Sequence, residues 1–163
     1  LMYFKSLDGS EGFFPFSENY HENGILKKTS APACLDSNIE IEIKTKAKKL
    51  AQNLNLYGVL AIELFELLDG SIVFNEIAPR PHNSFHWTLN GCNCSQFDIL
   101  VRTICGLPVK DVECNGKWEM TNLIGQEVNN MNLYYDQNYI LHIYGKKNVK
   151  PGRKMGHFNR NIS

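Results

Sequence analysis

Apolar residues return every three or four positions in one stretch of the chain: Ile39, Ile43, Ala47, Leu50, Ala51 and Leu54. This spacing places them on one face of a helix, and lysines occupy several of the polar positions between them. Just ahead of the stretch, Ser37 and Glu40 have the spacing of a capping box. The pattern therefore predicts a helix over residues 38–53.

Runs rich in β-branched and aromatic residues predict six strands, over residues 1–7, 11–16, 57–68, 71–77, 118–124 and 139–144. Asp69-Gly70 separates the third run from the fourth, and this dipeptide between apolar runs is the strongest short signal of a hairpin. Ser95 with Asp98 begins a second helix, which ends at Gly106 and Pro108. We interpret the stretch from Asn19 to Gly24, which contains His21 and Asn23, as a loop.

These elements indicate an α+β fold with two parts. Residues 1–106 hold both helices and four of the strands, and residues 107–163 are expected to form a small β-rich domain. Residues 107–116 have the composition of a linker between them. The last part of the chain, from Gly145 on, is interpreted as a basic tail around Pro151-Gly152.

The predicted hairpin allows one geometric inference about chemistry. If Asp69-Gly70 is a two-residue loop, Leu68 faces Ser71 and Glu63 stands directly opposite Glu76. Their neighbours on that face are apolar, and include Phe65 and Phe74. Two carboxylates whose Cβ atoms are ~5 Å apart repel each other by roughly 3 kcal/mol at an effective dielectric of about 20.

A fold keeps such a pair when one carboxyl is protonated or when a cation lies between them. Oxygen ligands favour Mg²⁺ over zinc. Two other interpretations stay open: the register is shifted by one residue, or lysines of a neighbouring strand neutralise both carboxylates.

Composition narrows the class of protein. Hydrophobic residues make up 43% and charged residues 21% of the 163 residues, which is an ordinary globular balance. No apolar run reaches the ~18 residues of a membrane span, so we expect no membrane partner. The first residues, Leu1-Met2-Tyr3-Phe4, have the pattern of a strand interior and not of a signal peptide, so we expect a fragment of a longer chain.

Five cysteines without a framework spacing favour free thiols in a reducing cytoplasm, with a zinc site at Cys92 and Cys94 as the alternative. The net charge is zero, yet the last 19 residues hold six basic residues and no acidic ones. This asymmetry indicates a local anion site and not a nucleic-acid surface.

The residues after the carboxylate hairpin resemble a known family. Residues 75–84, Asn-Glu-Ile-Ala-Pro-Arg-Pro-His-Asn-Ser, continue through His86-Trp87-Thr88 and are similar to the signature of 5-(carboxyamino)imidazole ribonucleotide synthases. The similarity extends along nearly the whole chain, in these segments: 18–21, 24–26, 31–33, 58–63, 95–97, 106–108, 144–146 and 151–157.

This resemblance implies the C-terminal lobe of an ATP-grasp ligase, with an antiparallel sheet and packed helices, followed by the small β-rich domain. It implies ATP-dependent carboxylation of 5-aminoimidazole ribonucleotide by bicarbonate, through carboxyphosphate, in de novo purine biosynthesis. ATP and Mg²⁺ are the implied cofactors, because phosphoryl transfer depends on positioning and electrostatics. The expected enzyme is a cytoplasmic homodimer that binds no nucleic acid.

Roles carry over by motif. Glu63 and Glu76 are the predicted metal ligands, and His21, Asn75 and Glu76 the predicted nucleotide contacts. The side chain of Asn75 is expected to point away from Glu76, as in a regular strand. The predicted catalytic residues are Arg80, His82 and Asn83. The predicted substrate-binding residues are Arg80, His82, Asn83, Ser84, Lys146, Arg153 and Lys154.

Departures from the family pattern and rival interpretations remain. Phe85 stands where the family usually has glycine, so a ring is expected to narrow the pocket or shift Ser84, and Cys94 replaces a hydroxyl residue. The family's N-terminal half, with its nucleotide-binding lysines, is missing, so we expect no carboxylation by this chain alone.

The alternatives are a zinc pair at His82 and His86, another ATP-grasp ligase of purine synthesis such as the formate-dependent glycinamide ribonucleotide transformylase, and a non-catalytic anion- or RNA-binding module.

Overall fold

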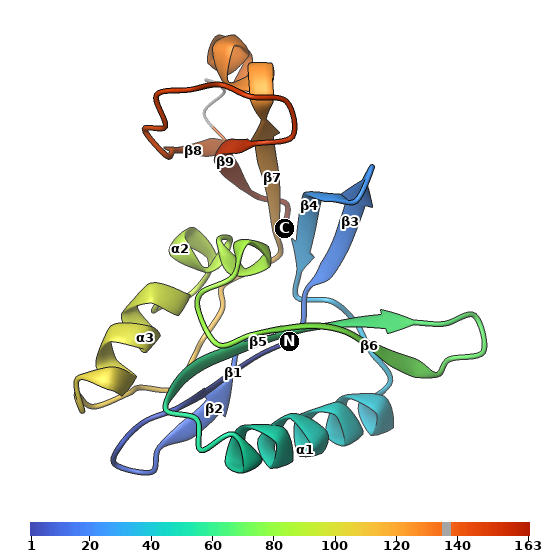
Figure 1. The fold of residues 1–163 in the computed structure, drawn as a ribbon, viewed down its shortest axis with the longest axis vertical. Helices are drawn as coiled ribbons and strands as arrows, with labels where there is room; N and C mark the ends of the chain where they lie inside the picture. The colour runs from blue at the N-terminus through green and yellow to red at the C-terminus, as the bar shows by residue number, and fades with distance from the viewer. Residues whose placement is uncertain (135–137) are drawn as a thin grey trace.

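Two antiparallel sheets form the framework of the computed structural model, which describes residues 1–134 and 138–163. The first sheet has the strand order β2 (Glu11–Phe13), β1 (Met2–Lys5), β5 (Gly58–Glu66) and β6 (Ile72–Ala78). The second has the order β3 (Glu18–Glu22), β4 (Ile25–Ala31), β7 (Trp118–Ile124), β9 (Lys154–Asn161) and β8 (Tyr139–Ile143). Figure 1 shows the second sheet above the first, with the β5–β6 hairpin extending to one side.

Side chains of β5 point alternately into two hydrophobic cores, one on each face of the first sheet. Leu60 and Ile62 of β5 pack with Ile43 and Ala47 of α1 (Ser37–Asn53), which lies along one face of the sheet (Figure 1). The residues between them face the opposite core, which contains Ile99 of α3 (Gln96–Ile104). Both faces of the sheet are therefore buried along the first half of β5, where successive residues point into different cores. The α+β prediction is confirmed.

In the part of the chain that the structure describes, three shorter helical segments complete the fold, two between β6 and α3 and one between β7 and β8. They are the 3₁₀ helix η1 (Asn83–Phe85), α2 (Thr88–Gly91) and the 3₁₀ segment η2 (Gly125–Tyr134). Within the described residues, no helix has the length and apolar character that a membrane crossing requires.

The stretch from Asn19 to Gly24 forms a hairpin and not a loop. It contains β3 and the turn into β4, with Asn23 at φ 51° and Gly24 at φ 75°. Two consecutive positive φ values are typical of the tight turns that match the twist of paired strands. The polar residues of β3 concealed it, because four of its five residues are exposed at the edge of the sheet.

The predicted basic tail is also wrong for residues 154–161, which form β9 in the interior of the second sheet. Met155 and Phe158 are buried there, and most of the basic residues lie in the loop before the strand. The predicted boundary at 106/107 stays a prediction. Across it, Ala31 of β4 pairs with Trp118 of β7, so the second sheet contains strands from both predicted parts.

Two local predictions are corrected. Asp36 caps α1 by accepting hydrogen bonds from the N–H groups of Asn38 and Ile39, at 2.9 and 3.4 Å, while Glu40 forms an ion pair with Lys44. The expectation of free thiols is wrong for Cys92 and Cys114, which form a disulfide across an isolated antiparallel bridge. Cys34, Cys94 and Cys105 are free.

Candidate metal and anion site

The predicted pairing of Glu63 with Glu76 is present, although the predicted turn is not. Near the turn Phe65 pairs with Val73, and the N–H of Leu67 donates to the carbonyl of Ser71 at 2.8 Å. The loop therefore has three residues, and this part of the register differs by one from the predicted one. A β-bulge between Glu63 and the next pair restores the predicted register, so Glu63 and Glu76 are opposed.

The bulge also changes the surroundings of Glu63. Asn75 is the extra residue, and its Nδ2 donates to Oε2 of Glu63 at 3.3 Å. The prediction that Asn75 points away from Glu76 assumed a regular strand, and the bulge, which breaks the alternation of side chains, directs Asn75 to Glu63 instead. Phe74 pairs with Leu64, so it does not lie on the face that carries Glu63. Val73, which pairs with Phe65, lies on that face instead.

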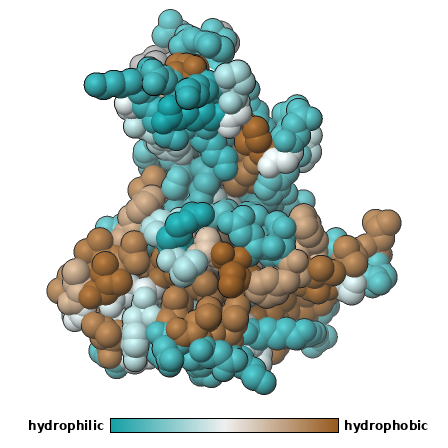
Figure 2. All heavy atoms as spheres, viewed as in Figure 1, coloured by the Kyte–Doolittle hydropathy of each residue, from teal (hydrophilic) through white to brown (hydrophobic). Residues whose placement is uncertain are grey.

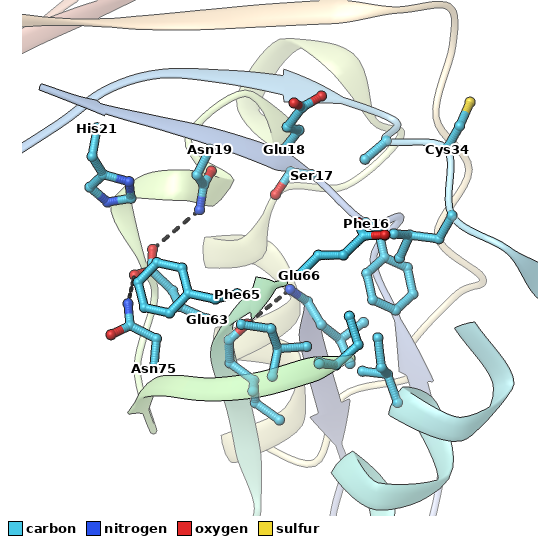
Figure 3. Close-up of a pocket in the computed structure, with 17 residues that line it drawn as sticks. Phe16, Ser17, Glu18, Asn19, His21, Cys34, Glu63, Phe65, Glu66 and Asn75 are labelled. Carbon is cyan, nitrogen blue, oxygen red and sulfur yellow. Dashed lines mark hydrogen bonds between the residues drawn. The ribbon is translucent and has the colours of Figure 1, made fainter. Parts of the chain in front are cut away.

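Glu63 is held from a second direction by Asn19 of β3. The Nδ2 of Asn19 donates to Oε1 of Glu63 at 3.2 Å, so each carboxylate oxygen accepts one amide hydrogen bond. The side chain of Glu63 is only 11% exposed, whereas that of Glu76 is 51% exposed. Figure 3 shows Asn19 and Asn75 pointing toward Glu63 from opposite sides. Glu63 is thus the fixed carboxylate of the pair and Glu76 the exposed one.

His82 joins the two carboxylates. One ligand atom from each of Glu63, Glu76 and His82 lies within 4.8 Å of the other two. The buried side chain of Gln96 fixes the main chain of His82, accepting from its N–H at 2.8 Å and donating to its carbonyl at 2.9 Å. Burial lowers the pKa of His82, and this outweighs the carboxylates of Glu63 and Glu76, which raise it. The imidazole of His82 is therefore neutral at pH 7.

The donor set suits a magnesium ion in part. Two carboxylates supply the oxygen ligands that Mg²⁺ prefers, and an imidazole suits Zn²⁺ or another transition metal better. His82 already has a partner, because its Nδ1 lies 2.8 Å from Oγ of Ser84. Glu63 and Glu76 therefore fit as the metal ligands, with His82 beside them.

Other residues of the signature have structural contacts. Arg80 is 60% exposed, and its Nη2 lies 3.8 Å from Oε1 of Glu76. Asn83 exchanges amide hydrogen bonds with Asn122 of β7, at 2.9 and 2.6 Å. Ser84 is buried against His82. Phe85 points into the core beside Phe14, so the expectation that its ring narrows the pocket is wrong.

A cleft of about 450 Å³ lies between the carboxylates and the second sheet. Its polar walls are formed by these residues: His21, Glu63, Glu76, His82, Lys146 and Lys154. Burial lowers the pKa of the Lys154 ammonium, while Glu63 and Glu76 act in the opposite direction. Acidic and basic groups face one cleft, as a site for a metal-bound anion requires.

Arg153 is not among the residues that line this cleft, and its Nη1 donates to the carbonyl of Asn148 at 3.0 Å. Lys146 does line it, and its Nζ donates to the carbonyl of Lys154 at 2.6 Å. Of the three basic residues predicted from the tail, the structure thus brings Lys146 and Lys154 to the carboxylates.

A second cleft, of about 460 Å³, lies on the other side of Glu63 (Figure 3). Its apolar part includes Phe16, Ile43 and Ile62, and its polar edge includes Asn19 and Asn75. Glu63 and His21 line both clefts. The carboxylate site therefore lies at the junction of a mostly polar cleft and one with a large apolar wall.

Sequence reasoning gave no role to Asn19, Gln96 or Asn122. The segment of Asn19 and His21 was part of the family resemblance, which could have suggested a role. Gln96 also lies in a segment of that resemblance, 95–97, whereas Asn122 gave no such signal, because its contacts join residues far apart in the chain.

Comparison with known proteins identifies the fold family. A model of the ATP-grasp domain matches residues 1–97, which is more than half of the chain. The chain belongs to the ATP-grasp family. A model of the phosphoribosylaminoimidazole carboxylase C-terminal domain matches residues 119–161, so the ATP-grasp part is followed by a second known domain.

Several curated proteins are similar to the chain. The N5-carboxyaminoimidazole ribonucleotide synthase of Bacillus subtilis is 43% identical, over 94% of this chain and 41% of that protein. The bifunctional purine synthesis protein purC/E of Dictyostelium discoideum is 41% identical, over 94% of this chain and 17% of that protein. The chain thus spans less than half the length of these curated relatives.

Solved structures agree with this ATP-grasp assignment. An ADP complex of an N5-carboxyaminoimidazole ribonucleotide synthetase superimposes with a TM-score of 0.91 at 38% identity, covering 98% of this chain and 43% of that one. The Aspergillus clavatus synthase in complex with ADP and 5-aminoimidazole ribonucleotide gives 0.84 at 35% identity, covering 99% and 45%. The resemblance found in the sequence, to synthases of this kind, is confirmed.

Proposed function

We propose that the complete protein carboxylates 5-aminoimidazole ribonucleotide with bicarbonate and ATP, through carboxyphosphate, in de novo purine biosynthesis. The observation that carries this proposal is that Glu63 lines two clefts at once. A nucleotide in the cleft with the apolar wall and a phosphorylated substrate in the lysine-lined cleft would meet at the Glu63–Glu76 pair. Similarity to synthases of this reaction supports the same arrangement.

In this proposal Mg²⁺, when bound by Glu63 and Glu76, neutralises phosphate charge during transfer. Asn75 and His21 border the nucleotide. The neutral His82 and the exposed Arg80 face the reacting end, where a guanidinium suits a planar carboxylate. Closing the site against water protects carboxyphosphate from hydrolysis.

Lys154 and Lys146 are the proposed contacts of the ribose 5-phosphate, because their ammonium groups reach the cleft opposite the carboxylates. Arg153 stays a predicted phosphate residue. To bind the phosphate, the Arg153 guanidinium would have to share or give up its hydrogen bond to the carbonyl of Asn148. Asn83 and Ser84 also stay predictions, and their contacts favour roles in holding the signature segment.

We also propose a homodimer built on α3. Phe97, Val101 and Ile104 form an exposed apolar stripe at helical spacing, each at least 40% exposed. Figure 2 shows hydrophobic residues gathered over α2 and α3. A two-fold axis near Val101 would set Phe97 of one copy against Ile104 of the other and bring Asp98 near Arg102, so the stripe is self-complementary. We place the enzyme in the cytoplasm, where ATP and ribonucleotides are metabolised.

The test of the reaction uses a chimera in which residues 1–163 replace the matching segment of the Bacillus subtilis relative. We expect ADP release that requires both bicarbonate and aminoimidazole ribonucleotide. Glu76→Gln should lower this rate about 100-fold or more, since a metal ligand contributes at least as much as its supporting residues. The matched control Glu42→Gln removes an exposed carboxylate of α1 and should have no effect. ADP release at the same rate with and without aminoimidazole ribonucleotide would contradict the proposed substrate.

A further inference from the structure

The two carboxylate oxygens of Glu63 accept hydrogen bonds from neutral amide groups. Asn19 donates to Oε1 at 3.2 Å and Asn75 donates to Oε2 at 3.3 Å. Each oxygen keeps a lone pair for another ligand, since a carboxylate has about four acceptor sites. Amide donors fix the rotamer without adding a positive charge that would compete with a metal ion.

The amide of Asn19 is itself oriented by Thr29. The Oγ1 of Thr29 donates to Oδ1 of Asn19 at 2.9 Å, which turns the Nδ2 of that amide toward Glu63. The reverse orientation would direct the amide oxygen at a carboxylate, and two acceptors repel each other. Thr29 is fully buried, so its hydroxyl has no bulk water as an alternative partner.

Strand pairing holds this arrangement in place. Asn19 of β3 lies directly opposite Thr29 of β4, and Thr29 in turn pairs with Met120 of β7. Glu63 belongs to the other sheet, on β5. A chain of hydrogen bonds therefore runs from Thr29 through Asn19 to Glu63. Through it, an interior strand of the second sheet fixes the proposed metal-binding carboxylate of the first sheet.

We infer that Asn19 and Thr29 are positioning residues, which hold Glu63 in the orientation that binds the metal ion. This inference rests on the proposed function for the identity of the metal site, and it adds two residues that act on the metal ion through Glu63. Loss of such a supporting contact is expected to weaken metal binding about 10–100-fold.

The test measures Mn²⁺ affinity of the 163-residue chain by electron paramagnetic resonance, with Mn²⁺ as the probe. Thr29→Val keeps the shape of the side chain and removes the hydroxyl, so its affinity should fall about 10-fold or more. Thr29→Ser keeps the hydroxyl and should retain most of the affinity. The matched control is Thr103→Val, which removes another fully buried hydroxyl, bonded only within α3.

Thermal unfolding without metal identifies any variant that fails to fold, and Asn19→Leu provides a second removal of the contact. Unchanged Mn²⁺ affinity in folded Thr29→Val and Asn19→Leu would overturn the inference, as would an equal loss in Thr103→Val. A wild-type chain that binds no Mn²⁺ would overturn it as well. If the Thr29→Val effect is found but the chimera releases no substrate-dependent ADP, the proposed reaction fails and the positioning role stands.

Discussion

Three histidines pack ring against ring where the ATP-grasp part meets the C-terminal strands. The ring centroid of His157 lies 5.0 Å from that of His86 and 4.6 Å from that of His142. Burial, with a smaller effect from the neighbouring histidines, lowers the pKa of His157 to about 2, and mainly burial lowers that of His86 to about 4. Both rings are therefore neutral in the folded protein at any pH above about 4.

The sign of the resulting pH dependence follows from the unfolded chain, in which a histidine takes up a proton near pH 6.5. Between about pH 6.5 and pH 4 the unfolded state binds protons that the folded state of these two residues does not. The free energy of unfolding thus falls as the pH falls through this window. At pH 5 the loss is about 2 kcal/mol for each ring, or about 4 kcal/mol for both, relative to pH 8.

A loss of this size is a large part of the ~5–15 kcal/mol that stabilises a typical domain. The assay is urea unfolding at pH 8 and pH 5 at constant ionic strength. His157→Gln should remove about half of the difference, whereas His21→Gln, at an exposed position outside the cluster, should leave it unchanged. An unchanged difference in His157→Gln, or a wild-type difference below about 1 kcal/mol, would show that these two rings are not kept neutral by burial in the folded protein.

Further predictions follow from the clefts, the core and the α3 stripe. In the chimera, Lys154→Ala should raise the KM for aminoimidazole ribonucleotide about 10–100-fold, and an equal rise for ATP would contradict phosphate binding. Gly91→Ala should lower the free energy of unfolding by about 1–3 kcal/mol in urea titration, because a Cβ would lie 2.9 Å from atoms of both Trp87 and Trp118. Val101→Glu should convert the complete enzyme from dimer to monomer in sedimentation, and a persisting dimer would exclude α3 as its interface.

The sequence predicted well those elements whose apolar residues have a helical spacing or form β-rich runs. The helix of α1 and the strands β5, β6 and β7 lie within one or two residues of their predicted bounds. The edge strand β3 was missed because its side chains are mostly exposed, and β9 was missed because its basic residues resembled a solvated tail. β9 becomes a strand through pairing with β7, which lies far away in the chain, whereas β3 pairs with β4 directly after it.

The opposition of Glu63 and Glu76 was predicted correctly from a turn that was predicted incorrectly. The three-residue loop and the bulge at Asn75 shift the register in opposite directions, so Glu63 still faces Glu76. The contact of Asn75 with Glu63 could not be predicted, because a bulge depends on tertiary packing. The carboxylate site was therefore foreseeable from the motif, while the groups that orient it required the structure.

The most direct test of the metal site is anomalous scattering from Mn²⁺ in crystals of the complete enzyme with ADP. We expect a peak between the carboxylates of Glu63 and Glu76, with Mn²⁺–oxygen distances of about 2.0–2.3 Å to both and to phosphate oxygens of the nucleotide. A peak that is coordinated by only one of these carboxylates, or that lies outside the junction of the two clefts, would contradict this expectation.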